Sequence, residues 1–273
     1  MPIHDDLGKR MKEFYENVPK TKLMRRTPVA IRLDGKAFHT FTRGFNKPFD
    51  NVLATAMQDT MKYLCENIQG CVFGYTQSDE ITLILVDYKR LNSSAWFDYE
   101  VQKVCSVAAS MATMAFNKAF HRAINEEDFR WKTGLTPQSV EIQQEHQKYM
   151  ETLRAAEDKG AMFDARCFNI PKEEVTNLVY WRQLDAIRNS IQMVGQAYFS
   201  QAKLQNKSCS DIQDMLMDEK NIYWEAYPTF FRRGSACIKV KSDTISLWEV
   251  DKNMPTLKDE GREYLESLIQ CEE

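Results

Sequence analysis

The sequence predicts an α+β fold of the ferredoxin-like type, in which an antiparallel sheet carries helices on one face. Two observations support this prediction. The expected elements follow one another in the order β-α-β-β-α-β, which is the split βαβ arrangement. The expected helices repeat apolar residues at steps of three and four, whereas the expected strands are short runs rich in β-branched and aromatic residues. In this arrangement the end of the central first strand meets the turn between the second and third strands.

Length and composition fit one large domain, or one domain with an appended lobe. The 273 residues are 43% hydrophobic, which allows a substantial core. No apolar run is long enough to span a membrane, and charged residues interrupt the start of the chain, so we expect a cytoplasmic protein. The seven cysteines are scattered without a CxxC pair, which predicts reduced thiols and no structural zinc. The net charge of -3 argues against a broad basic surface but leaves room for a local basic groove.

The N-terminal half supplies the first elements. In order, they are a helix with a basic connector (5–26), a strand (28–34), a helix (50–67) and two strands joined by a polar tip (71–77 and 81–86). Asp50 or Asn51 is available to cap the second helix. The polar tip carries Asp79, which would stand beside the end of the first strand.

The C-terminal half completes the sheet and adds an extension. Its expected elements are a helix (97–119), a polar excursion that becomes helical near 137 (121–160), a strand (161–168), a long helix opened by Pro171, and a hairpin with arms 227–241 and 244–250 and Ser242-Asp243 near its turn. We expect residues 1–170 to form the main domain, and 171–273 to pack on that same domain as a helical and hairpin extension. The excursion is given no chemical role.

Two carboxylates, Asp34 at the end of the first strand and Asp79 in the tip, are expected to be neighbours in the sheet. Mg²⁺ is typically bound by one or two carboxylates together with substrate phosphates. A pair of such ions could activate an attacking oxygen and neutralise a leaving pyrophosphate. Gly35 either lets a backbone group approach the metal closely or is an ordinary turn glycine.

Side chains near these acids are candidate phosphate contacts, although each one taken alone is more often a solvated surface group. The cationic candidates are Lys36, His39, Lys47 and Lys103. Ser78 either donates to a phosphate or makes the turn. Glu80 is either a third ligand or the structural partner of a lysine, because it points to the opposite face from Asp79.

Five motifs in a fixed order resemble the tRNA-histidine guanylyltransferase family. They are Arg32-Leu-Asp-Gly-Lys-Ala-Phe-His39, Lys47-Pro48, Gly74-Tyr-Thr-Gln-Ser-Asp-Glu80, Phe163-Asp-Ala-Arg166 and Trp181-Arg-Gln-Leu-Asp-Ala-Ile-Arg-Asn-Ser190. The resemblance covers residues 25–200. It implies a catalytic domain like the palm of conventional polymerases, acting on tRNA in the reverse, 3′-to-5′ direction with Mg²⁺.

The resemblance also implies roles for individual residues. Asp34 and Asp79 would be the metal carboxylates, Gly35 would offer its carbonyl to the metal, and Glu80 would complete the catalytic set. The nucleotide would be bound by Asp34, Gly35, Lys36, Ala37, Phe38, His39, Lys47, Ser78, Asp79, Lys103 and Asn189. The substrates of the protein would be GTP or another nucleoside triphosphate, with ATP as a further substrate. The assembly would be a homotetramer built as a dimer of dimers.

The long helix departs from the family pattern. Where histidine guanylyltransferases have His-Ile-Asn-Asn, this chain has Ile187-Arg188-Asn189-Ser190, and a basic position in the preceding long helix is Glu100. These changes fit the guanylyltransferase-like branch, whose members resemble 3′-5′ RNA polymerases that repair truncated tRNA 5′ ends. Strict selection for histidine tRNA is therefore not expected.

The leading hypothesis is a Mg²⁺-dependent nucleotidyltransferase that adds nucleotides to the 5′ end of tRNA, either as end repair or as guanylate addition to histidine tRNA. A non-catalytic RNA-binding module has the same order of elements, but it needs exposed aromatic residues on its central strands. A palm-type nucleotide cyclase would use similar metal-binding acids without RNA. Both remain as alternatives at this stage.

Overall fold

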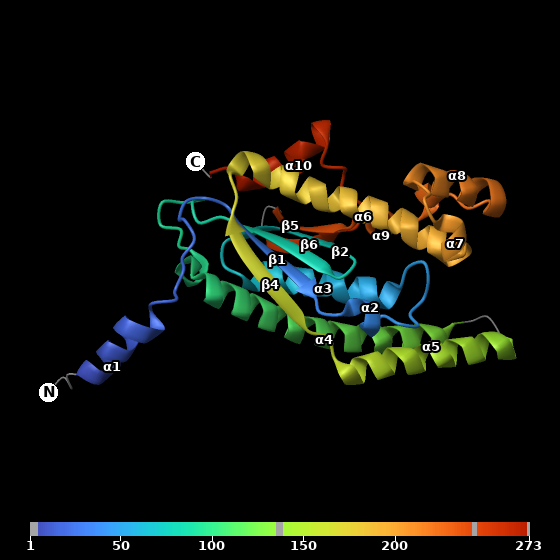
Figure 1. Cartoon of the computed structure of the whole chain (residues 1–273), viewed down its shortest axis with the longest axis horizontal. Coiled ribbons are helices and arrows are strands. Elements are labelled where there is room, and N and C mark those ends of the chain that lie inside the picture. The colour runs from blue at the N-terminus through green and yellow to red at the C-terminus, as the bar shows by residue number, and fades with distance from the viewer. Residues whose placement is uncertain (1–4, 135–138, 242–244, 272–273) are drawn as a thin grey trace.

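A six-stranded antiparallel sheet forms the centre of the computed structural model, which describes residues 5–134, 139–241 and 245–271. Its strands, in the order β4-β1-β3-β2-β5-β6 across the sheet, are β1 (Val29–Gly35), β2 (Cys71–Gln77), β3 (Glu80–Leu85), β4 (Phe163–Asn169), β5 (Ser235–Lys241) and β6 (Ser246–Asp251). The first four strands confirm the predicted ferredoxin-like arrangement, with β1 in the middle between β3 and β4 (Figure 1).

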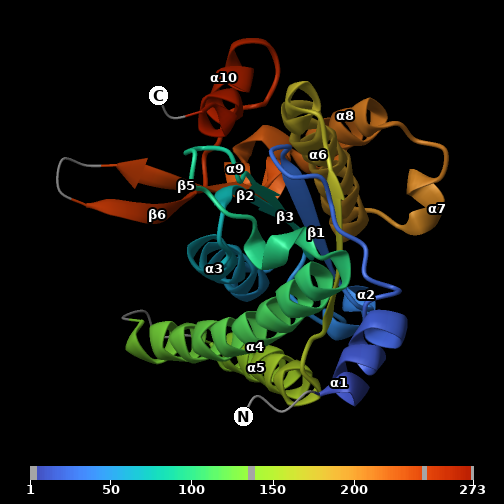
Figure 2. The ribbon, with the colours of Figure 1, turned by 90° about the vertical axis from the view of Figure 1, so that its left-hand side faces the viewer.

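Helices cover both faces of this sheet. The two helices of the β-α-β-β-α-β unit, α3 (Asn51–Asn67) and α4 (Val101–Thr133), lie on one face, as predicted, and α6 (Val175–Tyr198) crosses the other (Figures 1 and 2). Successive side chains of a strand point to opposite faces, so β1 contributes to two cores. Its Ile31 and Leu33 pack into the core beneath α3 and α4, whereas Ala30 joins the core beneath α6.

The start of α4 differs from the prediction. The helix begins at Val101 rather than at Phe97, because Phe97, Asp98 and Tyr99 all have positive φ angles, of 50°, 53° and 54°. The carboxylate of Asp98 accepts hydrogen bonds from the N-terminal connector, which holds this left-handed turn in place. The apolar pattern with helical spacing therefore begins four residues before the helix itself.

The polar excursion is helical from Val140, close to the predicted 137, and its first part is helical as well. Helix α4 continues to Thr133, and α5 (Val140–Lys159) returns along it (Figure 1). Charged pairs one turn apart, such as Lys132 with Asp128, stabilise the exposed part of α4. Trp131 stacks on His146 with 3.8 Å between ring centroids, which joins the two helices near their connection. The high charge of this region thus reflects exposed helix faces.

The predicted C-terminal hairpin is present but its first arm is shorter. A helix, α9 (Thr229–Arg233), precedes β5, and Gly234 ends it with a φ of 86°. A Cβ atom on Gly234 would lie 2.6 Å from the carbonyl oxygen of Thr76, so only glycine fits. The predicted turn residues Ser242-Asp243 lie outside the described residues.

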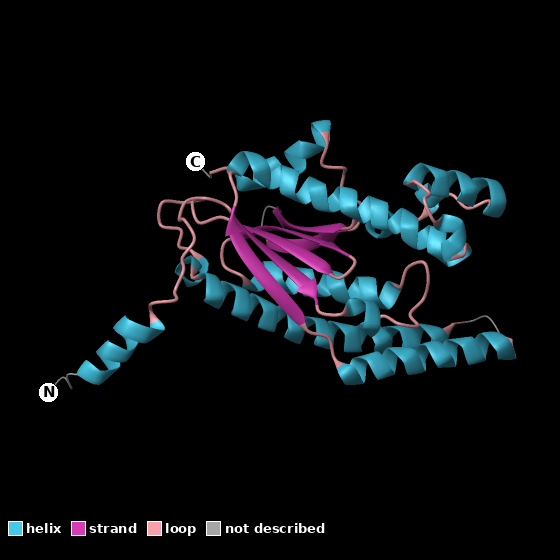
Figure 3. Ribbon diagram, viewed as in Figure 1, coloured by secondary structure: helices cyan, strands magenta, loops and turns pink. Residues whose placement is uncertain are grey.

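The remaining elements complete the picture given in Figure 3. They are α1 (Asp6–Met11) with a π-helical turn (Lys12–Glu16), α2 (Phe38–Phe41), α7 (Gln201–Leu204), α8 (Cys209–Lys220), α10 (Glu263–Glu266) and 3₁₀ turns at Trp96–Tyr99, Lys172–Glu174, Trp224–Ala226, Asp259–Arg262 and Ser267–Ile269. Since β5 pairs with β2, the extension continues the same sheet. The predicted boundary at residue 170 stays a prediction. None of the described helices is long and apolar enough to cross a membrane.

Candidate active site

Asp34 and Asp79 lie at the same end of the sheet. Asp34 is the last residue but one of β1, where it stands opposite Glu80 of β3 and Asp164 of β4. Asp79 belongs to the turn between β2 and β3, and its carbonyl oxygen accepts a hydrogen bond of 3.1 Å from the Gly35 amide. This bond ties the end of β1 to the turn and so brings the two acidic residues together.

Burial raises the pKa of both carboxyl groups. Desolvation is the main cause for Asp79; the Ser78 hydroxyl lowers its pKa and the charge of Asp34 raises it. Desolvation also leads for Asp34, followed by the repulsion from Glu80 and Asp164. Within the described ranges, neither Asp34 nor Asp79 forms an ion pair with a lysine or arginine. Neighbouring like charges that lack a cationic partner are suited to a divalent cation.

The donor set matches the way proteins bind Mg²⁺. The part of the chain that the structure describes contains no group of three or more histidine, cysteine, aspartate or glutamate side chains that could hold a metal by themselves. Two carboxylates leave the other coordination positions to water and to substrate phosphates. Mg²⁺ is commonly bound in this way, because it keeps several waters and needs few protein ligands.

The turns at this end of the sheet have constrained backbones. Ala37 and Ser78, with φ angles of 55° and 49°, occupy the left-handed region that non-glycine residues rarely adopt. Gly35 is needed for packing, since a Cβ atom there would lie 2.3 Å from the ring of Phe38. That ring is fixed among three others, from Phe41, Phe116 and Phe163. The buried Phe38 ring therefore shapes the turn that carries the acids.

A cleft beside the turns gathers most of the predicted phosphate contacts. Its volume of about 360 Å³ lies within the usual range of small-molecule sites. The predicted site residues that line it are Phe38, His39, Lys47, Ser78 and Asp79. Lys36 and Ala37 are exposed on the adjoining turn, and the Lys36 amide donates to the Met162 carbonyl at 2.8 Å. One cleft therefore holds a lysine, a histidine and a serine next to the Asp79 carboxylate.

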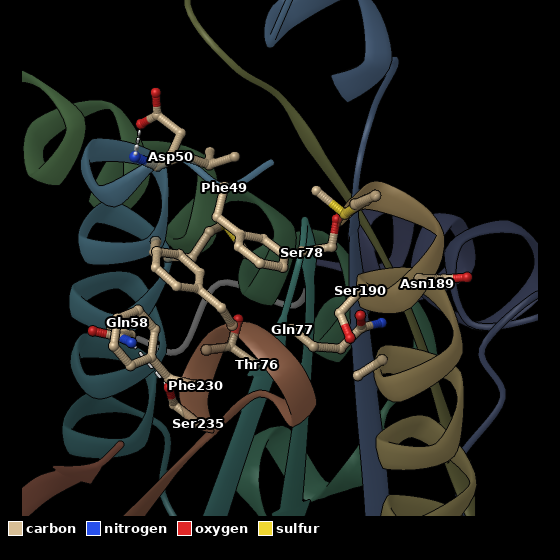
Figure 4. Close-up of a pocket in the computed structure, with 16 residues that line it drawn as sticks. Phe49, Asp50, Gln58, Thr76, Gln77, Ser78, Asn189, Ser190, Phe230 and Ser235 are labelled. Atoms are coloured by element: carbon tan, nitrogen blue, oxygen red, sulfur yellow. Dashed lines mark hydrogen bonds between the residues drawn. The ribbon is translucent and has the colours of Figure 1, made fainter. Parts of the chain in front are cut away.

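A second pocket adjoins this cleft and lies between α3 and α6 (Figure 4). The two share Asp50 and Ser78 among their lining residues. Its walls are largely aromatic and thioether side chains, contributed by Phe49, Phe230, Phe231, Met57 and Met193. Uncharged polar groups, from Gln58, Thr76, Gln77, Asn189, Ser190 and Ser235, line much of the rest, and among the described residues of the lining the shared Asp50 is the one acidic residue. Such a lining suits a neutral planar group more than a phosphate. The structure thus brings Asn189 to the adjoining pocket.

Asp50 is a site residue that the sequence identified only as a helix cap. Its Oδ1 accepts from the Leu53 amide at 3.0 Å, which is the capping bond. Its Oδ2 accepts from the Asn46 amide at 3.1 Å and from the Tyr149 hydroxyl at 2.8 Å. Tyr149 belongs to α5, which had been given no chemical role. No local pattern could reveal this contact, because it joins residues 99 positions apart.

Glu80 is held by arginines on the face of the sheet beneath α6. Its Oε2 lies 2.6 Å from Arg182 Nη2 and accepts from Arg182 Nε at 2.9 Å, while its Oε1 accepts from Arg32 Nη2 at 3.3 Å. Gln77 donates to the same carboxylate at 3.2 Å. Of the two roles open to Glu80, these contacts match the structural one, with arginines in place of the expected lysine.

Lys103 lies away from the other predicted site residues. It is in the first turn of α4, where its Nζ sits 4.9 Å from the ring centroid of Phe97. The adjoining turns of α4 contact Cys167 of β4, near the far end of the sheet. The end that carries Asp34 is contacted ten residues later, by Thr113, which corresponds to about 15 Å along a helix. Within one chain, Lys103 is therefore not brought to the cleft.

The departures in the long helix have structural explanations. Ser190 is buried: its single hydroxyl hydrogen is shared between the Ile187 and Arg232 carbonyls, at 2.8 and 3.0 Å, and its oxygen accepts from the Trp224 indole. Ile187 packs in the small apolar core between α6 and α8. Both residues thus stabilise the join between the long helix and the C-terminal extension.

Comparisons with known proteins agree with this geometry. A family model described as tRNAHis guanylyltransferase matches residues 8–171. A bacterial tRNA(His) guanylyltransferase-like protein in complex with ATP is 39% identical, with a TM-score of 0.77 over 97% of this chain and 99% of that one. A bacterial protein of the same description in complex with GTP is 36% identical, with a TM-score of 0.69 over 96% and 99%. A probable tRNA(His) guanylyltransferase of Dictyostelium discoideum is 25% identical over 80% of this chain and 77% of its own length.

Proposed function

This chain belongs to the tRNAHis guanylyltransferase family and is a nucleotidyltransferase, and on that premise we propose that it adds nucleotides to the 5′ end of tRNA in the 3′-to-5′ direction with the help of Mg²⁺. The observation that carries the proposal is the placement of Asp34 and Asp79 at one end of the sheet, beside a cleft lined by His39, Lys47 and Ser78. A nucleoside triphosphate needs both features, a metal site and cationic contacts to its phosphates.

In this proposal each residue has a defined task. Asp34 and Asp79 hold the metal, with the Gly35 carbonyl as a further oxygen donor. Metal ions held there would supply activation of the attacking oxygen and neutralisation of the leaving pyrophosphate. Lys47 and Ser78 bind the triphosphate in the cleft by charge-assisted hydrogen bonds. The remaining predicted contacts, from Lys36 to His39, orient the same triphosphate from the turn after β1.

Similar proteins indicate which nucleotides and which RNA this protein uses. Bacterial proteins of this fold have been solved with ATP and with GTP, which supports both as ligands here. The largely uncharged pocket beside the cleft, which includes Asn189, is positioned to receive a base. Because Ile187 and Ser190 replace family residues, 5′-end repair of several tRNAs is favoured over addition to histidine tRNA alone. Within one chain, the proposal includes neither Glu80 as a catalytic residue nor Lys103 as a nucleotide contact.

The same resemblance supports proposals for the location, the oligomeric state and the domain division of the protein. The protein would act in the cytoplasm as a homotetramer, a dimer of dimers, with a palm-like catalytic part over residues 1–170 and an extension over 171–273. Light scattering of the purified protein gives its mass in solution. A monomer at micromolar concentration would remove the tetramer from the proposal without touching the chemistry.

The function is tested by incubating the protein with a 5′-truncated tRNA, labelled nucleoside triphosphates and Mg²⁺. We expect label at the 5′ end, which is lost with EDTA. Transcripts with a 5′ monophosphate and a 5′ triphosphate are compared, since only the first needs activation by ATP. Binding of tRNA without any addition would favour an RNA-binding module. Formation of a nucleotide product without RNA would favour a cyclase.

A further inference from the structure

Two charged rows cross the face of the sheet that α6 partly covers. In the outer row, Asp34 stands between Asp164 and Glu80; in the next row, Arg32 stands opposite Arg166. The rows are two residues apart along each strand, about 7 Å. Like charges placed directly opposite each other destabilise a sheet. Of these acids, Asp34 belongs to the proposed metal site, whereas the paired arginines have no part in that site.

An exposed aromatic ring lies over the arginine row. The Cζ atoms of Arg32 and Arg182 lie 5.3 and 4.6 Å from the ring centroid of Trp181, a residue of α6. Both guanidinium groups hold the ring by cation–π contacts. Trp181 nevertheless keeps 53% of its surface exposed, so the ring is fixed and accessible at once. Rings of this kind serve as platforms on which unpaired bases stack.

The arginines differ in how firmly they are bound. Arg182 is almost fully buried and is neutralised by Glu80 and Asp185. Arg166, by contrast, has a side chain that is 56% exposed and pairs with Asp164, two residues away on the same strand, at 3.2 Å. Exposed ion pairs contribute little and exchange readily for another anion. Arg166 is therefore available to a phosphate. Arg32 across from it has a side chain that is 18% exposed and donates to Glu80 at 3.3 Å, so it adds positive charge beside Arg166.

We infer that Trp181, Arg32 and Arg166 form the docking surface for the 5′ end of the RNA. A base at that end stacks on Trp181, and the adjoining phosphate contacts Arg166, beside the charge of Arg32. The inference rests on the proposed function, which requires the RNA end to come within reach of Asp34. The arginine row meets this requirement, since it lies one row, about 7 Å, from that carboxylate. The nucleotide cleft, lined by His39 and Lys47, stays free for the triphosphate.

Substitutions at Trp181 test the stacking contact through binding, without turnover. The probe is a fluorescently labelled 5′-truncated tRNA, titrated in EDTA, and the affinity for ATP is measured in parallel. We expect Trp181→Ala to weaken RNA binding by about 5- to 150-fold, the value of one stacked base, and to leave ATP binding unchanged. Trp181→Phe keeps a ring and should retain most of the affinity. The matched control is Phe129→Ala, which removes an exposed aromatic residue of α4 far from this surface.

Arg166→Ala tests the phosphate contact separately. Loss of one contact should lower the slope of log affinity against log salt concentration by about 0.7 to 0.9. The inference is overturned if Trp181→Ala binds RNA like Phe129→Ala, if it loses ATP and RNA binding together, or if light scattering shows a changed mass, which would make the surface a subunit contact. If wild-type protein binds RNA through Trp181 but adds no nucleotide, the proposed function fails and this surface stands.

Discussion

Glu80 offers the sharpest test of how the acidic end of the sheet is divided between structure and chemistry. Its carboxylate accepts from two arginines and one glutamine, and the side chain of Arg182 is only 7% exposed. Glu80→Gln leaves that guanidinium with Asp185 as its remaining acidic partner. A hydrogen bond to a charged group contributes about 1.5–3 kcal/mol, and because Glu80 is 21% exposed we expect a loss of about 2–3 kcal/mol.

Thermal unfolding in EDTA measures this loss. For a chain of this size it corresponds to a fall in Tm of about 4–12 °C. Mg²⁺ affinity, measured by titration of the same variant, should change by no more than about threefold, through weaker long-range attraction alone. Glu173→Gln, an exposed carboxylate just before α6, is the control and should leave Tm unchanged. An unchanged Tm for Glu80→Gln together with lost Mg²⁺ binding would make Glu80 a metal ligand and refute the assignment.

Three further substitutions have defined outcomes. Gly35→Ala pushes a methyl group into the ring of Phe38 and should lower the free energy of unfolding by about 1–3 kcal/mol in urea denaturation; full stability would mean that the ring can move. Asp34→Asn should raise Tm in EDTA at neutral pH, because the raised pKa of Asp34 means that its negative charge disfavours the fold. This gain in Tm should vanish as pH falls through that pKa, where the wild-type carboxyl takes up a proton. A lower Tm for the variant at neutral pH would contradict this. Tyr149→Phe removes the hydroxyl that donates to Asp50 and should destabilise by about 1.5–3 kcal/mol, which a chemical denaturation curve would detect or exclude.

Local patterns were sufficient where a feature depends on neighbours in sequence. Strand β1 and helix α3 were located within a residue or two, since their apolar periodicity and the Asp50 cap are local. The meeting of Asp34 and Asp79 also followed, because the order of elements alone fixes it. The start of α4 was missed for the opposite reason. Left-handed residues at Phe97 to Tyr99 interrupt a pattern that still reads as helical.

Long-range partners were beyond the sequence. The contacts of Glu80 with Arg182 and of Asp50 with Tyr149 join residues about a hundred positions apart, and no spacing rule pairs them. Lys103 stays a prediction: its match to a family lysine carries no information on distance, and within one chain it does not reach the cleft. The reason for Gly35 also changed. Sequence suggested room for a metal or an ordinary turn, whereas the ring of Phe38 is what excludes a side chain.

The central claim is that Asp34 and Asp79 hold the metal and that the cleft beside them holds the triphosphate. A co-crystal with Mn²⁺ and a non-hydrolysable nucleoside triphosphate tests it directly, because Mn²⁺ is located by its anomalous scattering. The account predicts metal peaks between the two carboxylates, with the triphosphate running past Ser78 toward His39 and Lys47. Metal peaks at Glu80, or a triphosphate bound elsewhere on the chain, would contradict it.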